Sequence, residues 1–396
     1  MSEVKAQYEA FPYPERDPRD EKKRLITGSP SHPLELDHHL FGGRRDWSKV
    51  TRILVAGGGT GDALIQLAQT LTSARKKYDI TYIDLSEASR EVAQARAKMR
   101  GLKNITFITG SLLDAAQYGP FDYIDCCGVL HHLPDPQEGF DALAAALSPT
   151  GGIGVMVYAP YGRSGVYPLQ EAFGALTKGL PPAEQLAQAK AIYKALPENH
   201  AFKRNPHLVD HEQSDAGFYD LLLHSQDRPY TIDQLSESLV AAGLTVCGVP
   251  QPYLYDLSRF SKGHDEIDTI DAMALAEKLD GTVKTHVVYA RPTGAPSPRA
   301  GQSGDSVPHL RGMSGMALAK AVAAGRQIPV TLNGVRHNLE LAKQSAPILA
   351  GIDGRRSLEA LQAGAGMDPL MWAATWPKTS RKLEQFGLLL YSKLLA

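Results

Sequence analysis

The feature that most constrains the fold is a glycine-rich turn between an apolar run and a helical repeat. Residues 53–56 form an apolar run of strand length, and glycines occupy four of the five positions from 57 to 61. Apolar residues then recur at helical spacing over 64–71, and a second apolar run at 80–83 ends at Asp84. Strand, glycine turn, helix, strand and terminal acid predict a nucleotide-binding βαβ unit. The glycines let the backbone approach a ligand closely, and Asp84 is placed to accept both hydroxyls of a ribose.

The spacing of these glycines separates two classes of nucleotide site. A dinucleotide fingerprint needs G-x-G-x-x-G, and no register of this turn places a glycine last. The spacing that fits is G-x-G-x-G through Gly57, Gly59 and Gly61. In this the chain resembles the class I S-adenosylmethionine-dependent methyltransferases. Their motif commonly starts with an acid that contacts the methionine amino group, a position held here by Val55. On the glycines alone, a turn in some other α/β enzyme stays open.

The segments after two further predicted strands strengthen the resemblance. Residues 105–108 form a third strand, followed by Ser111 where the family usually has an adenine-binding acid. Residues 121–127 form a fourth strand, and residues 128–136 read Gly-Val-Leu-His-His-Leu-Pro-Asp-Pro. This resembles the segment after the fourth strand of many small-molecule and some protein methyltransferases. A fifth strand is expected at 153–158, and ligands bind at the carboxyl ends of such parallel strands.

The resemblance implies site residues at these strand ends and in the N-terminal segment. The implied S-adenosylmethionine contacts are Gly57, Gly58, Gly59, Thr60, Gly61, Asp84, Leu85, Ser111, Leu112, Gly128, Val129, Leu130 and Tyr13. Candidate catalytic residues are His131, His132 and Tyr158, although the histidine pair could serve only to shape the pocket. Candidate contacts to the methyl acceptor are Tyr8, Tyr161 and Arg163. No metal ligand set is expected, because His32, His38 and His39 have no cysteine or carboxylate partners at ligand spacing and the three cysteines lack metal spacing.

The expected architecture is an α/β, doubly wound, seven-stranded Rossmann-like methyltransferase sheet with additions. Residues 1–47 are an aromatic and proline-rich cap containing Tyr-Glu-Ala-Phe-Pro-Tyr-Pro. This motif resembles the Tyr-x-x-x-Pro-Tyr-Pro leader of bacterial multidomain methyltransferases, including tetratricopeptide-fused ones, in which the leader tends to fold over the cofactor. Residues 48–292 are the methyltransferase domain, with a helical substrate insertion at about 160–243 and an antiparallel strand at 285–292. Residues 293–307 are expected to be a linker.

The C-terminal segment, residues 308–396, is expected to be a small α+β domain. Asn333-Gly334 predicts a hairpin after the apolar run at 328–332. Helices are expected at 338–346, 357–363 and 369–386, and Pro377 should kink or split the last one. A final strand is expected at 388–391. The segment weakly resembles the winged-helix-like tails of bacterial protein lysine methyltransferases.

Charge and composition exclude several partners. The net charge of −1 and pI near 6.9 give no electrostatic commitment to nucleic acid or a membrane. No apolar run approaches the ~18 residues that span a bilayer, and the first ten residues lack a signal-peptide core. Three cysteines without metal spacing indicate a reducing compartment. We therefore expect a cytoplasmic protein, with its oligomeric state left open.

The resemblance implies an enzyme that transfers a methyl group from S-adenosylmethionine. The preferred acceptor is a protein side chain, lysine first, because the insertion and tail resemble those of protein methyltransferases. A small-molecule O- or N-methyltransferase is the alternative. Nucleic acid is disfavoured, since residues 128–131 replace the Asn/Asp-Pro-Pro-Tyr/Phe motif of base methylases. The non-acidic Val55 and Ser111 leave room for a non-catalytic cofactor-binding regulator or assembly factor.

Overall fold

The computed structural model describes residues 8–296 and 299–396, and a seven-stranded mixed sheet forms its centre. Residues 1–7 of the expected cap and 297–298 of the expected linker lie outside the described residues. The strands run in the order β3-β2-β1-β4-β5-β7-β6, with only β7 antiparallel to its neighbours. They are β1 (Thr51–Ala56), β2 (Tyr78–Asp84), β3 (Ile105–Thr109), β4 (Phe121–Cys127), β5 (Leu147–Tyr158), β6 (Leu244–Gly248) and β7 (Thr285–Pro292). The predicted fold class is confirmed.

The first strand shows why its sequence is apolar throughout. Successive side chains of a strand point to opposite faces, and both faces of β1 are covered. Ile53 and Val55 pack in one buried cluster with α3 (Asp62–Ser73). Leu54 packs in a second cluster, which includes residues of α5 (Pro136–Ala145), α10 (Ile232–Ala241) and α11 (Thr269–Asp280). The strand ends of β1 to β4 therefore meet at one edge, where sequence reasoning placed the site.

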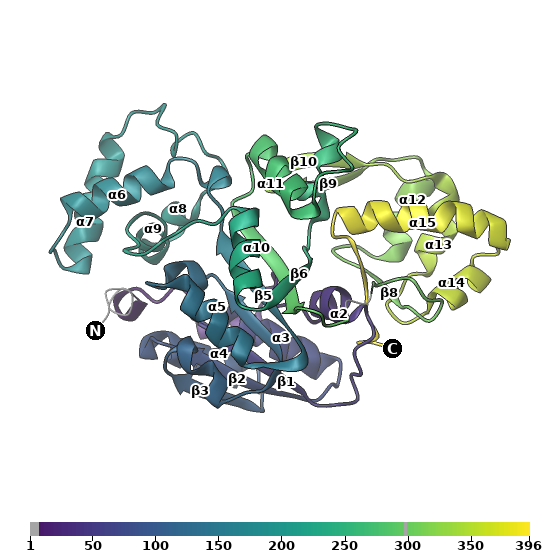
Figure 1. Cartoon of the computed structure of the whole chain (residues 1–396), viewed down its shortest axis with the longest axis horizontal. Helices are drawn as coiled ribbons and strands as arrows, with labels where there is room; N and C mark the ends of the chain where they lie inside the picture. The colour runs from purple at the N-terminus through teal and green to yellow at the C-terminus, as the bar shows by residue number, and fades with distance from the viewer. Residues whose placement is uncertain (1–7, 297–298) are drawn as a thin grey trace.

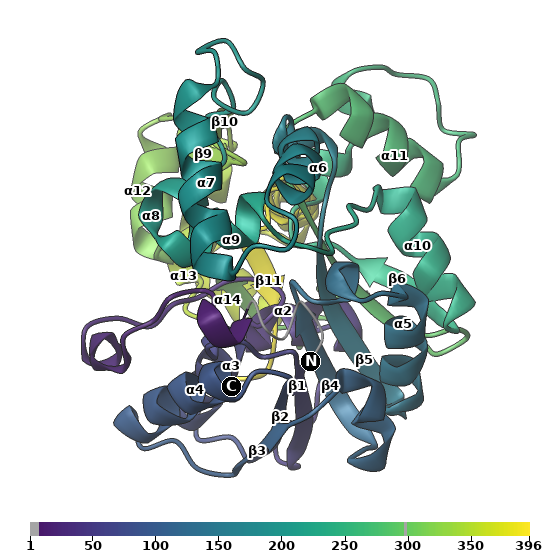
Figure 2. The same ribbon diagram turned by 90° about the vertical axis from the view of Figure 1, so that its left-hand side faces the viewer.

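The helical insertion has a small core of its own above that edge. It contains α6 (Val166–Leu176), α7 (Pro182–Ala195), α8 (Asp210–Gln213) and α9 (Asp215–Leu222). Phe173, Phe202 and Phe218 are buried there among leucines. Figure 2 shows these helices standing over the strand ends, and Figure 1 shows the insertion and the C-terminal unit at opposite ends of the long axis.

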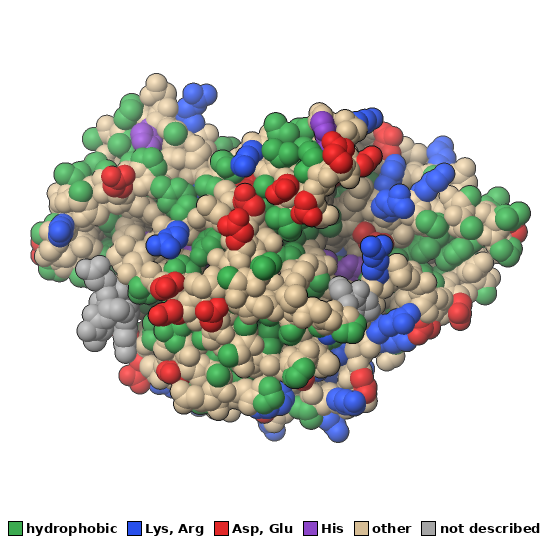
Figure 3. Space-filling model, viewed as in Figure 1, with side chains coloured by type: hydrophobic (Ala, Val, Ile, Leu, Met, Phe, Trp, Pro, Cys, Tyr) green, Lys and Arg blue, Asp and Glu red, His purple; other side chains and the backbone are tan. Residues whose placement is uncertain are grey.

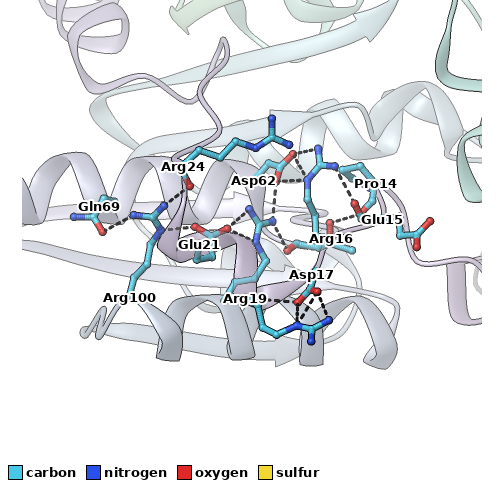
Figure 4. A network of polar contacts seen from close by, with 12 residues as sticks. Pro14, Glu15, Arg16, Asp17, Arg19, Glu21, Arg24, Asp62, Gln69 and Arg100 are labelled. Carbon is cyan, nitrogen blue, oxygen red and sulfur yellow. Dashed lines mark hydrogen bonds and ion pairs between the residues drawn. The ribbon is translucent and has the colours of Figure 1, made fainter. Parts of the chain in front are cut away.

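An N-terminal segment crosses the same edge; we call residues 8–31 the strap. It contains the short helix η1 (Pro18–Lys22) and is tied to α3 and α4 (Glu87–Met99) by charged side chains. Arg16 and Arg96 both bind Asp62, with closest distances of 2.7 Å, and Arg96 also binds Glu21 at 2.7 Å. Figure 4 shows this chain of ion pairs continuing to Arg100. The strap is thereby fixed beside the glycine turn.

The C-terminal unit consists of four helices and two small antiparallel sheets. Its elements are β8 (Pro308–Leu310), α12 (Gly315–Ala323), β9 (Ile328–Leu332), β10 (Val335–Leu339), α13 (Ala346–Gly351), α14 (Leu358–Gly364), α15 (Pro369–Gln385) and β11 (Leu389–Tyr391). The hairpin and the final strand are confirmed. The helix expected at 338–346 is wrong, because Asn338 and Leu339 still pair with β9. The winged-helix-like description stays a prediction.

Of the two outcomes expected at Pro377, a split of the last helix does not occur, and a kink stays a prediction. Helix α15 runs through it from Pro369 to Gln385. Residues Trp376, Thr379 and Leu383 on one side of this helix are buried, so packing offsets the backbone hydrogen bond that proline cannot make.

The C-terminal unit closes against α2 (Pro33–Phe41), close to the start of the chain. The buried carboxylate of Asp37 accepts hydrogen bonds from the Trp47 indole at 2.9 Å and the Ser392 hydroxyl at 2.6 Å. The Tyr391 amide donates to Nδ1 of His38 at 3.0 Å. The expected linker makes contacts too, since the carbonyl of Ser306 accepts from the amide of Leu358 at 2.9 Å. The expected domain boundaries stay a prediction.

The surface carries both signs of charge. In Figure 3, acidic and basic side chains are interspersed over the face shown, in keeping with the small net charge. Within the described residues, no helix is long and apolar enough to cross a bilayer.

Candidate active site

A cavity of about 760 Å³ lies between the strand ends, the strap and the insertion. Two groups of its lining residues differ in chemistry. The glycine end is lined by Gly57, Gly58, Gly59, Asp84, Ser111, Leu112 and Gly128. The histidine end is lined by Tyr8, His132, Tyr158, Arg163, Asp220 and Gln226.

The glycine end is shaped by backbone that tolerates no side chain. Gly57 has φ of +66°, and a Cβ there would stand 2.5 Å from a methyl of Val129. A Cβ on Gly58 would stand 2.2 Å from the ring of Tyr82. Gly59 has φ of +51°, and its Cβ would approach the carbonyl of Tyr13 to 3.1 Å. The turn is therefore in close contact with the segment that follows β4, with β2 and with the strap. Only glycine fits at these positions.

Asp84 joins this turn to the second strand. Its carboxylate accepts the Gly59 amide at 2.7 Å through Oδ2 and the Ser86 amide at 2.8 Å through Oδ1. Burial raises the pKa of Asp84, and these two amides act in the opposite direction. Each oxygen retains a further lone pair, so the group can hold the turn and still accept a ribose hydroxyl. Ser111 has a capping role: its hydroxyl accepts the Leu113 amide at 3.2 Å.

The histidine end is organised around the buried carboxylate of Asp220. Its side chain comes from α9 and the residue is only 3% exposed. The Tyr8 hydroxyl donates to Oδ1 at 3.0 Å, and the Tyr158 hydroxyl donates to Oδ2 at 3.3 Å. Burial raises the pKa of Asp220, while the Tyr8 hydrogen bond and the neighbouring His132 and Arg163 lower it. The strap, β5 and the insertion thus meet at one carboxylate.

The backbone of Gln226 assigns opposite tautomers to two stacked histidines. The rings of His132 and His224 lie 3.8 Å apart at 20°. Nδ1 of His132 is 2.7 Å from the Gln226 carbonyl, which can only accept, so this nitrogen carries the proton and Nε2 keeps its lone pair. Nδ1 of His224 accepts the Gln226 amide at 3.1 Å, so its Nε2 donates to the Tyr8 oxygen at 3.2 Å. His132 is therefore a proton acceptor and His224 a donor.

Of the two acids at this end, Asp227 pairs with an arginine and Asp220 does not. Arg163 is 3.3 Å from Asp227 and stacks 3.7 Å above the ring of Tyr158. Those two opposite charges neutralise each other. Asp220 makes no salt bridge with any lysine or arginine of the described chain. The histidine end consequently holds a buried carboxyl group without a lysine or arginine partner, inside a ring of aromatic side chains.

Three of these groups also have the spacing of a metal site. The ligand atoms of His132, Asp220 and His224 lie within 4.8 Å of one another. A cation on Nε2 of His224 would leave that ring without a proton, because its Nδ1 already accepts an amide. A cation at this position would therefore have to displace either that proton or the Gln226 amide, and the absence of a metal stays a prediction.

The structure places the sequence-predicted residues in two groups. The residues that line the cavity are Gly57, Gly58, Gly59, Asp84, Leu85, Ser111, Leu112, Gly128, Val129, Tyr13, His132, Tyr158, Tyr8 and Arg163. Those outside the lining are Thr60, Gly61, Leu130, His131 and Tyr161. The Thr60 hydroxyl instead donates to the Pro14 carbonyl at 2.6 Å, which secures the strap. Tyr161 is 37% exposed at the surface.

Several functional candidates were missed by sequence reasoning. Asp220, His224 and Gln226 lie in the insertion, with no motif around them that marks a site. Asp125 is one of two aspartates in β4, where it passed as part of the strand pattern. Only the fold brings these residues to the cavity, so no local signal identifies them.

The cavity suits the cofactor implied by the glycine turn. A nucleoside needs close backbone approach, which the crowded glycines provide, and a carboxylate for the ribose, which Asp84 provides. Asp125 lines the cavity, and its buried Oδ1 has no hydrogen-bond partner in the described part of the chain. An unsatisfied buried acceptor at this position fits a ligand with a donor group.

Comparison with known proteins agrees with this geometry. Residues 54–153 match the family described as a methyltransferase domain. An uncharacterized protein of Synechococcus sp. is 35% identical over 252 residues, which are 62% of this chain and 59% of that relative. The ubiquinone biosynthesis O-methyltransferase of Bordetella avium is 31% identical over 136 residues, which are 34% of this chain and 52% of that enzyme. The chain thus spans less than two thirds of these relatives' length.

Solved structures show the same fold over most of the chain. The structure of PKMT2 from Rickettsia typhi superposes with a TM-score of 0.67 at 18% identity, covering 93% of this chain and 77% of that one. The complex of PKMT2 with AdoHcy gives a TM-score of 0.66 at 17% identity, with the same coverage. At this level of identity the likeness concerns the fold.

Proposed function

Because the chain carries a class I, S-adenosylmethionine-dependent methyltransferase domain, we propose that it transfers a methyl group to a protein side chain, namely the amine of a lysine. Supporting observations come from both ends of the cavity. The glycine end fits the nucleoside of the cofactor, and the histidine end carries the chemistry that an amine requires. The PKMT2 neighbour, a protein lysine methyltransferase, is consistent with this proposal.

The observation that carries the proposal is the buried carboxyl group of Asp220, which has no lysine or arginine partner among the described residues. A buried carboxylate without a cation is costly, and a ligand that brings the cation recovers that cost. A lysine ammonium supplies one positive charge and several donors, and aromatic rings attract it further. Tyr8, Tyr158 and the two stacked histidines provide such rings around Asp220. A neutral phenol would leave the charge unbalanced.

The residues of the histidine end can bind the amine, orient it and remove its proton. The ammonium binds Asp220, while Tyr8 and Tyr158 hold that carboxylate from two sides. One N–H bond of the ammonium then breaks, and its proton forms a new bond to the lone pair of Nε2 on His132. The imidazolium that results is stabilised by Asp220, and the amine is left with a free electron pair.

S-adenosylmethionine, when bound, supplies a methyl group on a sulfonium that leaves with its bonding electrons on sulfur. The protein contributes the position of the acceptor. The acceptor nitrogen must lie in line with the breaking bond, and well-oriented reactants of this kind gain several kcal/mol, on the order of 7 or more. Residues of the strap and of the insertion line the cavity beside the strand ends.

Two other functions have some support. Ubiquinone biosynthesis O-methyltransferases match about a third of the chain, which favours a phenolic small molecule as the acceptor. For a phenol, Nε2 of His132 would take the hydroxyl proton. A non-catalytic, cofactor-binding regulator is the remaining alternative, suggested by Val55 and Ser111.

The experiment that separates these functions follows a labelled methyl group. The purified protein is incubated with methyl-labelled S-adenosylmethionine and a cell lysate, and the product is fractionated. Label in protein that is recovered as methyl-lysine after acid hydrolysis is the expected result. Label in a solvent-extractable metabolite would favour the small-molecule reaction. Binding of the cofactor with no transfer to any fraction would favour the regulator.

A further inference from the structure

The family's acid for the methionine amino group is missing from β1, but an acid stands beside its position. Val55 occupies the usual position. In the parallel pairing of β1 with β4, Val55 is the register partner of Asp125. Register partners on neighbouring strands present their side chains to the same face of the sheet. Both residues line the cavity, so the missing carboxylate has a counterpart one strand away.

Asp125 is a buried carboxyl group that can accept a further hydrogen bond. It is only 1% exposed, and its Oδ1 has no hydrogen-bond partner among the described residues. Its Oδ2 accepts the Tyr123 hydroxyl at 3.3 Å, and that hydroxyl lies closer, at 2.8 Å, to the carbonyl of Pro30. Burial raises the pKa of Asp125 to about 7, against weaker opposite effects of Ser31 and Tyr123. Such a carboxyl is poorly solvated and only weakly satisfied.

We propose that Asp125 binds the α-ammonium of the methionine part of S-adenosylmethionine, replacing from β4 the acid that β1 lacks. The proposal rests on the cofactor assignment made under Proposed function. An ammonium at Oδ1 would satisfy the unpartnered oxygen and supply the missing positive charge. Charge-assisted bonds of this kind are the strong ones, so the side chain should contribute measurably to cofactor affinity.

The geometry also explains how the departure at Val55 is tolerated. A carboxylate at position 55 and one at position 125 would face each other on adjacent strands with no cation between them. Like charges directly opposite in a sheet are destabilising. One acid at either position can serve the same ligand group, whereas two would repel in the free protein.

The test compares two ligands that differ in the amino-acid part. S-adenosylhomocysteine has the α-ammonium, and 5′-methylthioadenosine keeps the nucleoside and thioether without it. Asp125→Asn keeps the size of the side chain and removes its charge. Calorimetry should show S-adenosylhomocysteine bound at least ten-fold more weakly by this variant, with methylthioadenosine affinity unchanged within two-fold. Equal loss of both ligands, or loss of neither, would overturn the proposal.

A rescue variant provides the matched control. Val55→Asp in the Asp125→Asn background restores an acid at the family's usual position, and the lost affinity for S-adenosylhomocysteine should return. Failure of that rescue, with the protein folded by circular dichroism, counts against the shared role of the two positions. If Asp125→Asn does not fold, Asp125→Ser, which can still accept from Tyr123, carries the same comparison. Wild-type protein that binds neither ligand would contradict the cofactor assignment itself, whereas methylthioadenosine binding alone would contradict only the role of Asp125.

Discussion

The two ends of the cavity are built in different ways. The glycine end consists of backbone and residues at strand ends, all within residues 57–128, and its shape follows from close packing of turns. The histidine end is assembled from side chains that come from the strap, two strand-end segments and the insertion. Its central carboxylate, Asp220, is 212 residues away from Tyr8, which donates to it. Local sequence therefore determines one end, and tertiary structure determines the other.

The contrast also concerns charge. The glycine end offers amides and the carboxylate of Asp84, whose oxygens are already engaged by backbone. The histidine end holds the buried carboxyl group of Asp220 and two histidines with assigned tautomers. Mutations at one end should consequently affect binding of the nucleoside, and mutations at the other should affect transfer to the acceptor.

The largest effect is expected at Gly57. Gly57→Val places a branched side chain where even a Cβ stands 2.5 Å from Val129, at a positive φ that valine avoids. We expect cofactor affinity to fall by at least about a hundred-fold, or roughly 2.7 kcal/mol. Gly101→Ala is the control, because Gly101 also has positive φ but nothing within 4 Å of its Cβ. It should cost ~1 kcal/mol of stability and no affinity. Equal affinity loss in both variants would mean that the close approach has no role.

The next effect is expected at Asp84. Hydrogen bonds to a charged group are worth ~1.5–3 kcal/mol, so Asp84→Ala should weaken cofactor binding by roughly ten- to a hundred-fold. Asp84→Asn should lose less, since its amide oxygen can still accept one bond. Melting temperature should fall too, because Asp84 holds the amides of Gly59 and Ser86. An alanine variant that melts early but binds the cofactor normally would reduce Asp84 to a structural role.

At the other end, Asp220→Asn should affect the acceptor and leave the nucleoside alone. We expect turnover to fall at least ten-fold, with S-adenosylhomocysteine affinity unchanged within two-fold. Asp210→Asn is the control, since it removes a carboxylate from the cavity wall outside the Asp220 cluster. If Asp220 served the sulfonium instead of an amine, Asp220→Asn would lose the preference for S-adenosylmethionine over S-adenosylhomocysteine. Thermal melting without ligand should not fall, because an uncompensated buried charge has been removed.

The smallest effect is expected in the strap. Arg16→Ala removes a two-pronged pair with Asp62 that is partly exposed, where such pairs contribute about 0–1 kcal/mol. Cofactor dissociation should be a few-fold faster in stopped-flow traces, and the difference should shrink in high salt. Arg19→Ala is the control, because Arg19 pairs only with Asp17 inside the strap. A change of dissociation rate in the control alone would contradict a role for the Arg16 contact.

The sequence predicted the sheet and the glycine end well. Strand, turn, helix and terminal acid are adjacent in the chain, so periodicity and spacing were enough to place Gly57, Asp84 and Gly128 at one edge. His132, in a recognisable motif, was also placed beside the cavity. The assignment of roles to these residues stays a prediction.

Tyr8, His132, Tyr158 and Arg163 were predicted as candidates at the histidine end, but Asp220 and the histidine tautomers could not be predicted, and the reason is physical. Asp220 lies among apolar residues of a helix, where it looks like an ordinary polar position. Its role depends on hydrogen bonds from Tyr8 and Tyr158, which can form only after the strap and the insertion have packed. The tautomers depend on the backbone of Gln226, which carries no sequence signal at all. Pro377 leaves its helix unsplit for a similar reason, because tertiary packing outweighs a local preference.

The closure of α2 by β11 has a consequence for how the protein is made. Asp37 and Ser392, which share a hydrogen bond, are 355 residues apart. At ribosomal rates of about 5–20 residues per second, Asp37 waits roughly 20 to 70 seconds for that partner to be synthesised. Once β7 has been synthesised the sheet beside α2 can form, but α2 still lacks the cover of Tyr391 and Leu394. A chain that stops before β11 should therefore leave this face of α2 open to chaperones and proteases, whereas a chain that includes β11 covers it.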